Sequence, residues 1–295
     1  MAFDAHGDLL DIWALGFAAR PPQAFAVRTP SGRVAFASAP SGAFLAGVVR
    51  GGWIVSSGVA DRRLALVDRH AVASPLRLPA TTTRPRRGDV RVASRGQFVY
   101  RSSTGRLYRL ATKPSVPDPL AGYLTPDGAL VTVGSSPHRA AWATQGRRRT
   151  SSGRWTPFQS ADAVAGAADR VAVVLGRNLG NGVDANRVAG IASSRDGGRT
   201  WRVRSVPPAI DEALGVVVMP DGTVFVATGS GPLLRARPGQ RVDVVPGVRP
   251  YLVARSGDRV YALTSSHRSF TRPRLLVSAD DGRTWSPVPL PGREG

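Results

Sequence analysis

Two stretches of the sequence, 84 residues apart, carry the same pattern of side chains: SRDGGRTW at residues 194–201 and SADDGRTW at residues 278–285. Both read S-x-D-x-G-R-T-W. A serine hydroxyl and an aspartate carboxylate can hydrogen-bond the exposed backbone of a tight turn, a glycine supplies positive φ, and a tryptophan packs against a neighbouring element. We therefore predict a locked hairpin turn at each stretch, formed by Ser194, Asp196, Gly198, Thr200 and Trp201 and by Ser278, Asp280, Gly282, Thr284 and Trp285.

Short apolar or alternating runs recur along the chain, and each follows a turn rich in Gly or Asp. The runs are residues 9–13, 52–55, 97–100, 129–133, 171–174, 223–226 and 259–263, and the turns are marked by Gly7, Gly51, Gly96, Gly128, Asp169, Gly222 and Gly257. The markers lie on average about 42 residues apart, which is typical of a β-propeller blade of four short strands. The sequence predicts an all-β fold, a seven-bladed β-propeller that occupies residues 1–295 as a single domain, with six or eight blades as alternatives.

The repeated octapeptide resembles the Asp-box, or BNR repeat, which is known from sialidases, some glucan-cleaving propellers, sorting-receptor ectodomains and a photosystem assembly factor. In those families the boxes lie on the rim, away from the ligand face, so the resemblance implies a structural role for both boxes. Their separation of twice 42 residues predicts that they occupy the same place in alternate blades. A worn copy without the aspartate is expected at residues 150–155 (TSSGRW).

The resemblance also allows an enzyme. Sialidases use three arginines for the substrate carboxylate, a tyrosine nucleophile activated by a glutamate, and an aspartate as acid and base. The weak matches here are Glu212, Asp211 and Tyr251, but there is no Arg-Ile-Pro motif, and residues 224–228 lack the arginine that the family places there. We therefore expect a binding or scaffold protein without catalytic activity, and a sialidase-like glycoside hydrolase is the alternative.

The charge balance favours an anionic partner. Lys and Arg number 40 and Asp and Glu 20, a formal net charge of +20. Because Lys113 is the only lysine, GC-rich codon usage is a competing explanation for the many arginines. In propellers, the loops that join the second strand to the third, and one blade to the next, form the ligand face. The arginines predicted to bind there are Arg84, Arg86, Arg87, Arg139, Arg177, Arg268 and Arg272.

Such a face suits an anionic glycan or an acidic protein surface, because a guanidinium pairs bidentately with carboxylate and similar groups. Nucleic acid is a weaker expectation, since Phe270 is the clearest aromatic side chain on these loops that could stack on a base.

Several other classes of protein are excluded or disfavoured. The chain has no cysteine, so disulfides, thiolate zinc sites and iron–sulfur clusters are ruled out. His6, His70, His138 and His267 are scattered, and residues 177–186 offer a single carboxylate for Ca²⁺, so we expect no metal or cofactor. No apolar stretch approaches the roughly 18–20 residues of a membrane span. Residues before Arg20 include no basic side chain, so we expect no secretory leader there and a monomer that is cytoplasmic or secreted after removal of its leader.

Overall fold

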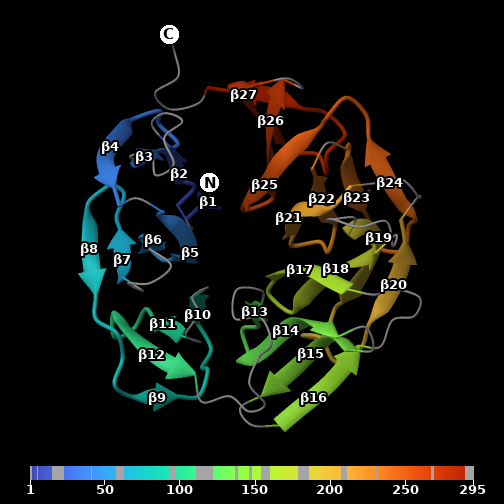
Figure 1. Cartoon of the computed structure of the whole chain (residues 1–295), viewed down its shortest axis with the longest axis horizontal. Coiled ribbons are helices and arrows are strands. Elements are labelled where there is room, and N and C mark those ends of the chain that lie inside the picture. Colours follow the sequence, from blue (N-terminus) through green and yellow to red (C-terminus); the bar gives the residue numbers. More distant parts are fainter. Residues whose placement is uncertain are drawn as a thin grey trace. The chain divides into compact units, whose positions relative to one another are not determined.

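The computed structural model describes residues 2–4, 6–14, 23–40, 42–57, 63–92, 98–110, 122–136, 139–145, 148–153, 160–178, 186–206, 211–229, 231–266 and 269–289. Within these ranges the description covers the backbone alone at residues 13–14, 132–136, 139–145, 148–153, 160, 178, 186, 265–266 and 269–273. Every regular element in them is a β-strand, and they contain no helix able to cross a membrane. The chain forms two compact units: residues 1–84, 88–111 and 289–295, and residues 85–87 and 112–288. Figure 1 labels the strands.

The described strands of the first unit form three four-stranded sheets. The first sheet contains β1 (Ala2–Phe3), β2 (Leu9–Ala14), β3 (Gln23–Arg28) and β4 (Val34–Ala39). The second contains β5 (Phe44–Val49), β6 (Gly52–Ser57), β7 (Arg63–Val67) and β8 (Ala73–Leu76). The third contains β9 (Thr82–Thr83), β10 (Asp89–Val92), β11 (Phe98–Arg101) and β12 (Arg106–Leu110).

The described strands of the second unit form four more sheets of the same size. They are β13 (Gly122–Leu124), β14 (Ala129–Ser136), β15 (Arg139–Gln145) and β16 (Arg148–Gly153), then β17 (Ser160–Ala167), β18 (Arg170–Asn178), β19 (Asn186–Ser194) and β20 (Arg202–Ser205). The last two are β21 (Ala213–Val218), β22 (Val224–Thr228), β23 (Leu233–Ala236) and β24 (Val242–Val245), and β25 (Pro250–Ser256), β26 (Arg259–Ser266), β27 (Ser269–Ser278) and β28 (Ser286–Val288).

The seven predicted runs are confirmed as strands, and each is the second strand of its sheet: β2, β6, β11, β14, β18, β22 and β26. The predicted turns precede them. Gly7, Gly51, Gly128, Gly222 and Gly257 all have positive φ, and at the Asp169 turn Ala168 takes that conformation, with φ of 51°. Gly96 lies outside the described residues. The repeat in the sequence thus follows the tight turn that joins the first two strands of each sheet.

Six of the sheets are antiparallel and keep their strands in chain order, but the sheet of β9 to β12 does not. Its order is β10-β11-β12-β9, and β9 pairs in parallel with β12. Arg101 on β11 holds the segment after β9 in place, because its Nη2 donates to the carbonyl oxygen of Arg84 and to Thr83 Oγ1, both at 3.3 Å. The prediction that the segment of Arg84 joins one blade to the next is therefore wrong, since β9 and β10 belong to one sheet.

The core lies between successive sheets. In the first unit Phe25 and Trp53 pack in one cluster from the first two sheets, and both are fully buried. In the second unit Phe225 is fully buried in a cluster shared by the sheets of β21–β24 and β25–β28. Truncating a buried aromatic side chain of this kind to alanine costs about 3–5 kcal/mol. Sheet-on-sheet packing thus supplies the apolar burial that no single sheet could achieve.

The predicted worn copy of the octapeptide is wrong. Residues 150–153 belong to strand β16, which pairs with β15 from Gln145↔Arg148 to Ala141↔Gly153. They therefore do not form the turn that residues 194–201 and 278–285 form. Trp155 lies outside the described residues.

Candidate anion-binding groove

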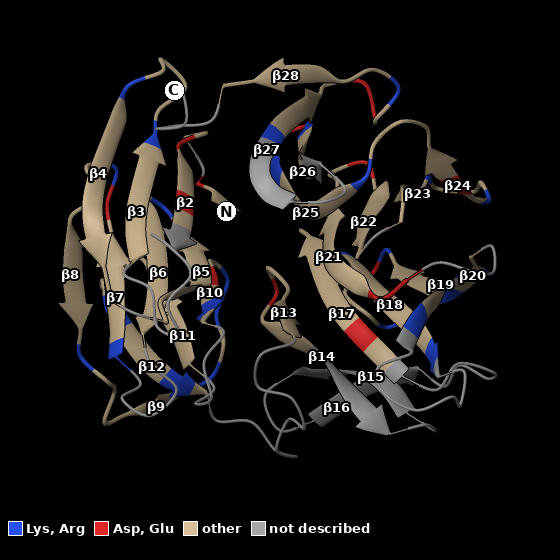
Figure 2. Cartoon of the chain, turned by 45° about the horizontal axis from the view of Figure 1, so that its top comes forward, with Lys and Arg blue, Asp and Glu red and all other residues tan. Residues whose placement is uncertain are grey.

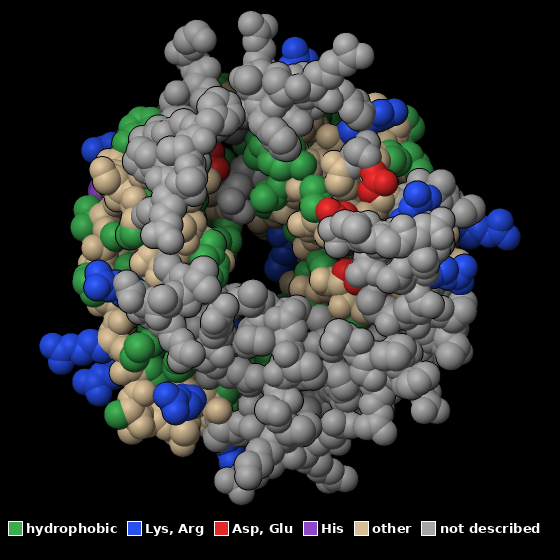
Figure 3. Space-filling view, viewed as in Figure 1, with side chains coloured by type: hydrophobic (Ala, Val, Ile, Leu, Met, Phe, Trp, Pro, Cys, Tyr) green, Lys and Arg blue, Asp and Glu red, His purple; other side chains and the backbone are tan. Residues whose placement is uncertain are grey.

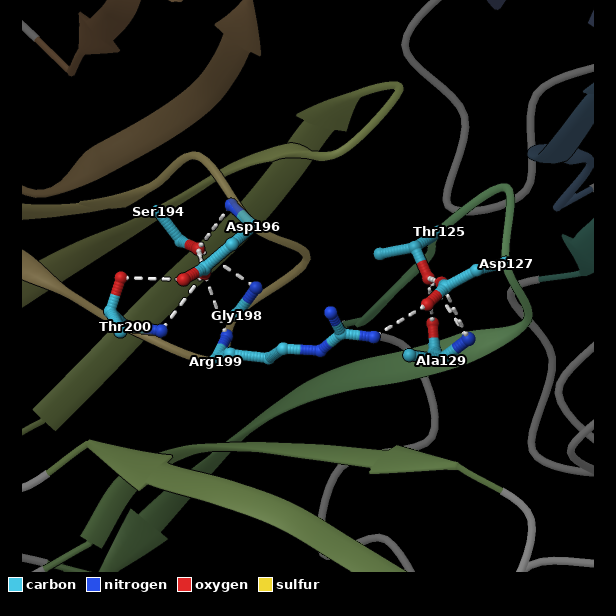
Figure 4. Close-up of polar contacts among 8 residues, drawn as sticks. All are labelled: Thr125, Asp127, Ala129, Ser194, Asp196, Gly198, Arg199 and Thr200. Carbon is cyan, nitrogen blue, oxygen red and sulfur yellow. Dashed lines mark hydrogen bonds and ion pairs between the residues drawn. The ribbon is translucent and has the colours of Figure 1, made fainter.

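The two matching octapeptides form the same hydrogen-bonded turn, one between β19 and β20 and one between β27 and β28. Ser194 Oγ donates to Asp196 Oδ1 at 2.7 Å and accepts from the Gly198 N–H at 2.8 Å. Asp196 Oδ1 also accepts from the Thr200 N–H at 2.9 Å, and Asp196 Oδ2 accepts from Thr200 Oγ1 at 2.6 Å. Figure 4 shows this network.

The second turn contains the corresponding hydrogen bonds, with closely similar lengths. Ser278 Oγ donates to Asp280 Oδ1 at 2.7 Å and accepts from the Gly282 N–H at 2.8 Å. Asp280 accepts from the Thr284 N–H at 2.9 Å and from Thr284 Oγ1 at 2.6 Å. Hydrogen bonds from the hydroxyl and N–H of Thr284 and from Ser278 hold the pKa of Asp280 well below its usual range. Both aspartates thus hold the backbone of their own turns in place through hydrogen bonds. Among the described residues, no group of three or more Asp, Glu or His side chains could hold a metal ion.

Each turn also touches the sheet that precedes its own. Arg199 Nη2 lies 3.3 Å from Asp127 Oδ2 in the β13–β14 turn, which is visible on the right of Figure 4. Arg235 on β23 donates from Nη1 to the carbonyl oxygen of Asp281 at 2.8 Å. Trp201 and Trp285 are half-buried among apolar side chains of the two adjoining sheets. The octapeptides therefore fasten neighbouring sheets together.

Beside the first of these turns, two adjoining cavities of about 290 and 480 Å³ run between the sheet of β17–β20 and the sheet of β21–β24. They share Arg202, Arg204 and Gly239 as lining residues. We call the two together the β20 groove. Its arginines come from the start of β18, the octapeptide turn, β20 and the approach to β24: Arg170, Arg195, Arg202, Arg204 and Arg241. Within the part of the chain that the structure describes, no Asp or Glu lines either cavity.

Arg204 lines both cavities of the β20 groove and is half-buried. Its Nη1 donates to the carbonyl oxygens of Arg237 and Gln240, at 2.5 and 3.4 Å, and its Nη2 donates to Ser193 Oγ at 3.3 Å. Burial lowers the pKa of Arg204, and the nearby charges of Arg202 and Arg195 lower it further. The charges in the groove thus repel one another, so a bound carboxylate, sulfate or phosphate would be favoured there.

The groove arginines differ in their exposure to solvent. Arg195, Arg202 and Arg241 are exposed, whereas Arg170 and Arg204 are half-buried. Figure 2 colours Lys and Arg blue along the ribbon, and Figure 3 shows blue side chains at several separate places on the face it presents.

The predicted ligand-binding arginines come from separate parts of the chain. Arg84, Arg86 and Arg87 are exposed in the segment between β9 and β10, and Arg177 is exposed near the end of β18. Arg139 lies in β15 and Arg272 in β27, at positions where only the backbone is described, and Arg268 lies outside the described residues. Their convergence on one face stays a prediction.

The predicted catalytic candidates lie directly before β21 and near the start of β25. Asp211 and Glu212 directly precede β21, where the Asp211 carbonyl accepts from the Val188 N–H and the Glu212 carbonyl from the Gly229 N–H, at 3.2 and 3.1 Å. Glu212 is exposed and Tyr251 is half-buried in β25. The start of β21 places Asp211 and Glu212, and the start of β25 places Tyr251. Catalysis by these residues stays a prediction.

The groove itself was missed by sequence reasoning, although a signal was present. Residues 202–204 read Arg-Val-Arg directly after an octapeptide. If the octapeptide is a turn, those residues begin a strand, and the period of two puts both arginines on one face.

No protein-family model matches the sequence, and no curated protein matches it. Solved structures do. Apo AztD from Citrobacter koseri aligns with a TM-score of 0.57 at 14% identity, over 96% of this chain and 82% of that chain. The β-propeller domain of the trilobed protease from Pyrococcus furiosus gives 0.55 at 9% identity, over 93% of both chains. YCF48 bound to D1 peptide gives 0.51 at 13% identity, over 94% of this chain and 88% of that chain. At these identities the likeness shows the fold alone, which is that of a β-propeller.

Proposed function

We propose that the chain is a single seven-bladed β-propeller of the Asp-box type that binds an anionic partner and catalyses no reaction. The observation that carries the proposal is the β20 groove, where five arginines line two adjoining cavities that, in the described residues, have no acidic lining side chain. Two other arginines of the second unit, Arg235 and Arg237, are paired, because both reach Asp243, with Nη2–Oδ2 distances of 2.5 and 3.0 Å. The contrast supports a role for the groove arginines in binding.

The partner proposed is an acidic protein surface or an anionic glycan. Guanidinium groups form bidentate, charge-assisted hydrogen bonds with carboxylate and sulfate oxygens, and the arrangement needs no metal. YCF48, one of the similar structures, is a propeller solved with a bound peptide, which supports a protein partner. The sequence-predicted loop arginines, Arg84, Arg86, Arg87, Arg139, Arg177, Arg268 and Arg272, are a second candidate surface for the same kind of ligand.

Binding of fluorescent poly-glutamate and of a heparin fragment at low salt tests this function. Two variants with the same change of charge separate the candidate surfaces. The groove variant is Arg195→Ser, Arg202→Ser and Arg241→Ser, and the loop variant is Arg84→Ser, Arg86→Ser and Arg87→Ser. We expect the parent protein to bind at least one polyanion and the groove variant to bind it at least tenfold more weakly. Failure of the parent protein to bind either polyanion contradicts the proposal.

The sialidase-like alternative has its own test. Purified protein is incubated with a fluorogenic sialoside, and the binding proposal predicts no release of the fluorophore. Turnover that is lost in Glu212→Gln and in Tyr251→Phe would replace the binding function by hydrolysis.

A further inference from the structure

Strand β20 is the outer strand of its sheet, and one of its edges, called here the open edge, pairs with none of the strands that the structure describes. Among the described strands, β20 pairs with β19 alone, in the register Ser193↔Arg202 to Gly190↔Ser205. The next residue, Val206, donates its N–H to the Ala189 carbonyl oxygen at 3.0 Å. In an antiparallel pair, bonded and non-bonded positions alternate, so Arg202 and Arg204 direct their backbone groups to β19. The N–H and C=O groups of Val203 and Ser205 therefore point away from the sheet, at its open edge.

The side chains of β20 alternate between two faces. Val203 packs with Trp201 against the apolar cluster of Val173 and Leu175. Arg202 and Arg204 lie on the opposite face, where both line the β20 groove. A strand added at the open edge would therefore place every second side chain beside two arginines.

We propose that an extended acidic peptide segment of a partner protein adds to the open edge of β20 as an antiparallel strand. Its carboxylates, at alternate positions, would lie beside Arg202 and Arg204 in the groove, and its main chain would exchange hydrogen bonds with Val203 and Ser205. Every pairing within the sheet of β17–β20 is antiparallel, and the added strand continues that pattern. This inference rests on the proposed anionic-ligand function and names the ligand and its mode of binding.

Positive charges on an edge strand also serve a purely protective purpose, since they prevent two copies of the chain from pairing edge to edge. The protective role and the binding role differ in whether they need a groove beside β20. Protection alone needs no groove, whereas the cavities of about 290 and 480 Å³ beside β20 offer room for side chains of an added strand. The lack of acidic lining residues, in the described part of the chain, favours a carboxylate-bearing occupant over a neutral one.

The experiment uses the unaltered protein and the fluorescent peptide (Glu-Thr)₅ in three forms: unmodified, N-methylated at each Thr, and N-methylated at each Glu. In the proposed register, Glu lies opposite Arg202 and Arg204, so the Thr residues face Val203 and Ser205 and donate to them. We expect N-methylation at Thr to weaken binding at least tenfold and N-methylation at Glu to change it less than threefold. Equal affinities for the two methylated peptides would overturn strand addition.

A protein variant provides a second readout. Ser205 is exposed and its N–H points outward, so Ser205→Pro removes one donor of the open edge, and Ser205→Ala keeps it. We expect the proline variant to lose at least fivefold in affinity for unmodified (Glu-Thr)₅, with Ser205→Ala unchanged and the heparin fragment bound equally by both. If the heparin fragment binds and the peptide does not, the anionic-ligand function stands and strand addition is wrong. If neither binds, both proposals are wrong.

Discussion

The guanidinium of Arg204 on β20 donates a hydrogen bond of 2.5 Å to the backbone carbonyl oxygen of Arg237, which directly follows β23 in the next sheet. One side chain thus joins two sheets of the second unit and also lines the groove together with Arg195 and Arg202. Burial lowers the pKa of Arg204, and the nearby positive charges of Arg202 and Arg195 lower it further. Fold stability and ligand attraction are linked at this position.

Replacement of Arg204 by Gln should lower the free energy of unfolding by about 1–3 kcal/mol, because the carbonyl oxygens of Arg237 and Gln240 lose a charged donor. The matched control is Arg202→Gln on the same strand, which is exposed and should change stability by less than about 0.5 kcal/mol. Urea unfolding followed by tryptophan fluorescence measures both. Equal effects of the two substitutions would show that the bridge contributes nothing.

Glycine is required at position 282 for a reason that position 257 does not share. Both have positive φ, 74° and 57°, but a Cβ on Gly282 would lie 2.8 Å from Phe225 Cε1, whereas nothing lies within 4 Å of a Cβ on Gly257. Gly257→Ala should therefore cost about 1 kcal/mol for the backbone conformation alone, and Gly282→Ala about 1–3 kcal/mol more. Denaturant unfolding of the two variants checks the difference. A smaller loss for Gly282→Ala than for Gly257→Ala would contradict the packing of the second octapeptide against β22.

Asp8 should reduce stability at neutral pH. Its side chain is almost wholly buried, and in the described residues neither carboxylate oxygen accepts a hydrogen bond, although Arg69 Nε lies 3.8 Å away. Burial raises the pKa of Asp8, and the charge of Asp4 raises it further. The folded state therefore binds a proton more tightly than the unfolded state, so this contribution to stability grows as the pH falls through the folded pKa.

Asp8→Asn is accordingly expected to raise the free energy of unfolding at pH 7 by about 1 kcal/mol and to have a smaller effect near pH 4. The test is urea unfolding of both proteins at the two pH values. A destabilising effect at pH 7 would mean that the carboxylate makes a favourable interaction in the folded protein.

Asp196 should behave in the opposite way. Burial raises its pKa, but hydrogen bonds from Thr200, Ser194 and the Arg199 N–H lower the pKa by more, so the net shift is downward. Its contribution to stability is then present above the unfolded pKa of about 3.9 and is lost as the pH falls through the lower folded pKa. We expect Asp196→Asn to destabilise at pH 7 and the difference from the parent to narrow below about pH 4. Thermal unfolding of both proteins across pH 2–7 measures the stability difference between them. A difference that does not change with pH would contradict a stabilising role for the ionised Asp196 carboxylate in the turn.

Much of the fold could be predicted because a positive-φ turn leaves a trace in the sequence. Gly7, Gly51, Gly128, Gly222 and Gly257 each mark the hairpin before a second strand, since few other residues adopt that backbone conformation. The order of β9 and β12 could not be predicted, because it depends on the contacts of Arg101 with Thr83 and Arg84, which are distant in sequence and have no local pattern.

The site was harder to predict than the fold. Surface charges need not recur at a regular spacing in the sequence. An arginine in a loop and an arginine in a groove therefore look alike in the sequence. Arg202 and Arg204 could have been found by applying strand alternation after the octapeptide, but Arg170 and Arg241 enter the groove only because two sheets pack side by side. Only the structure supplies that juxtaposition.

Binding of an anionic ligand in the β20 groove is tested most directly by the salt dependence of the affinity for the acidic peptide (Glu-Thr)₅. Dissociation constants are measured between about 50 and 200 mM salt, where screening of exposed charges changes strongly. The parent protein is compared with the groove variant and with a control that loses three exposed arginines elsewhere, Arg50→Ser, Arg106→Ser and Arg259→Ser. We expect a steep dependence for the parent and the control, and a shallow dependence with weaker binding for the groove variant. The same slope and affinity for the groove variant and the control would contradict the assignment of the ligand to the β20 groove.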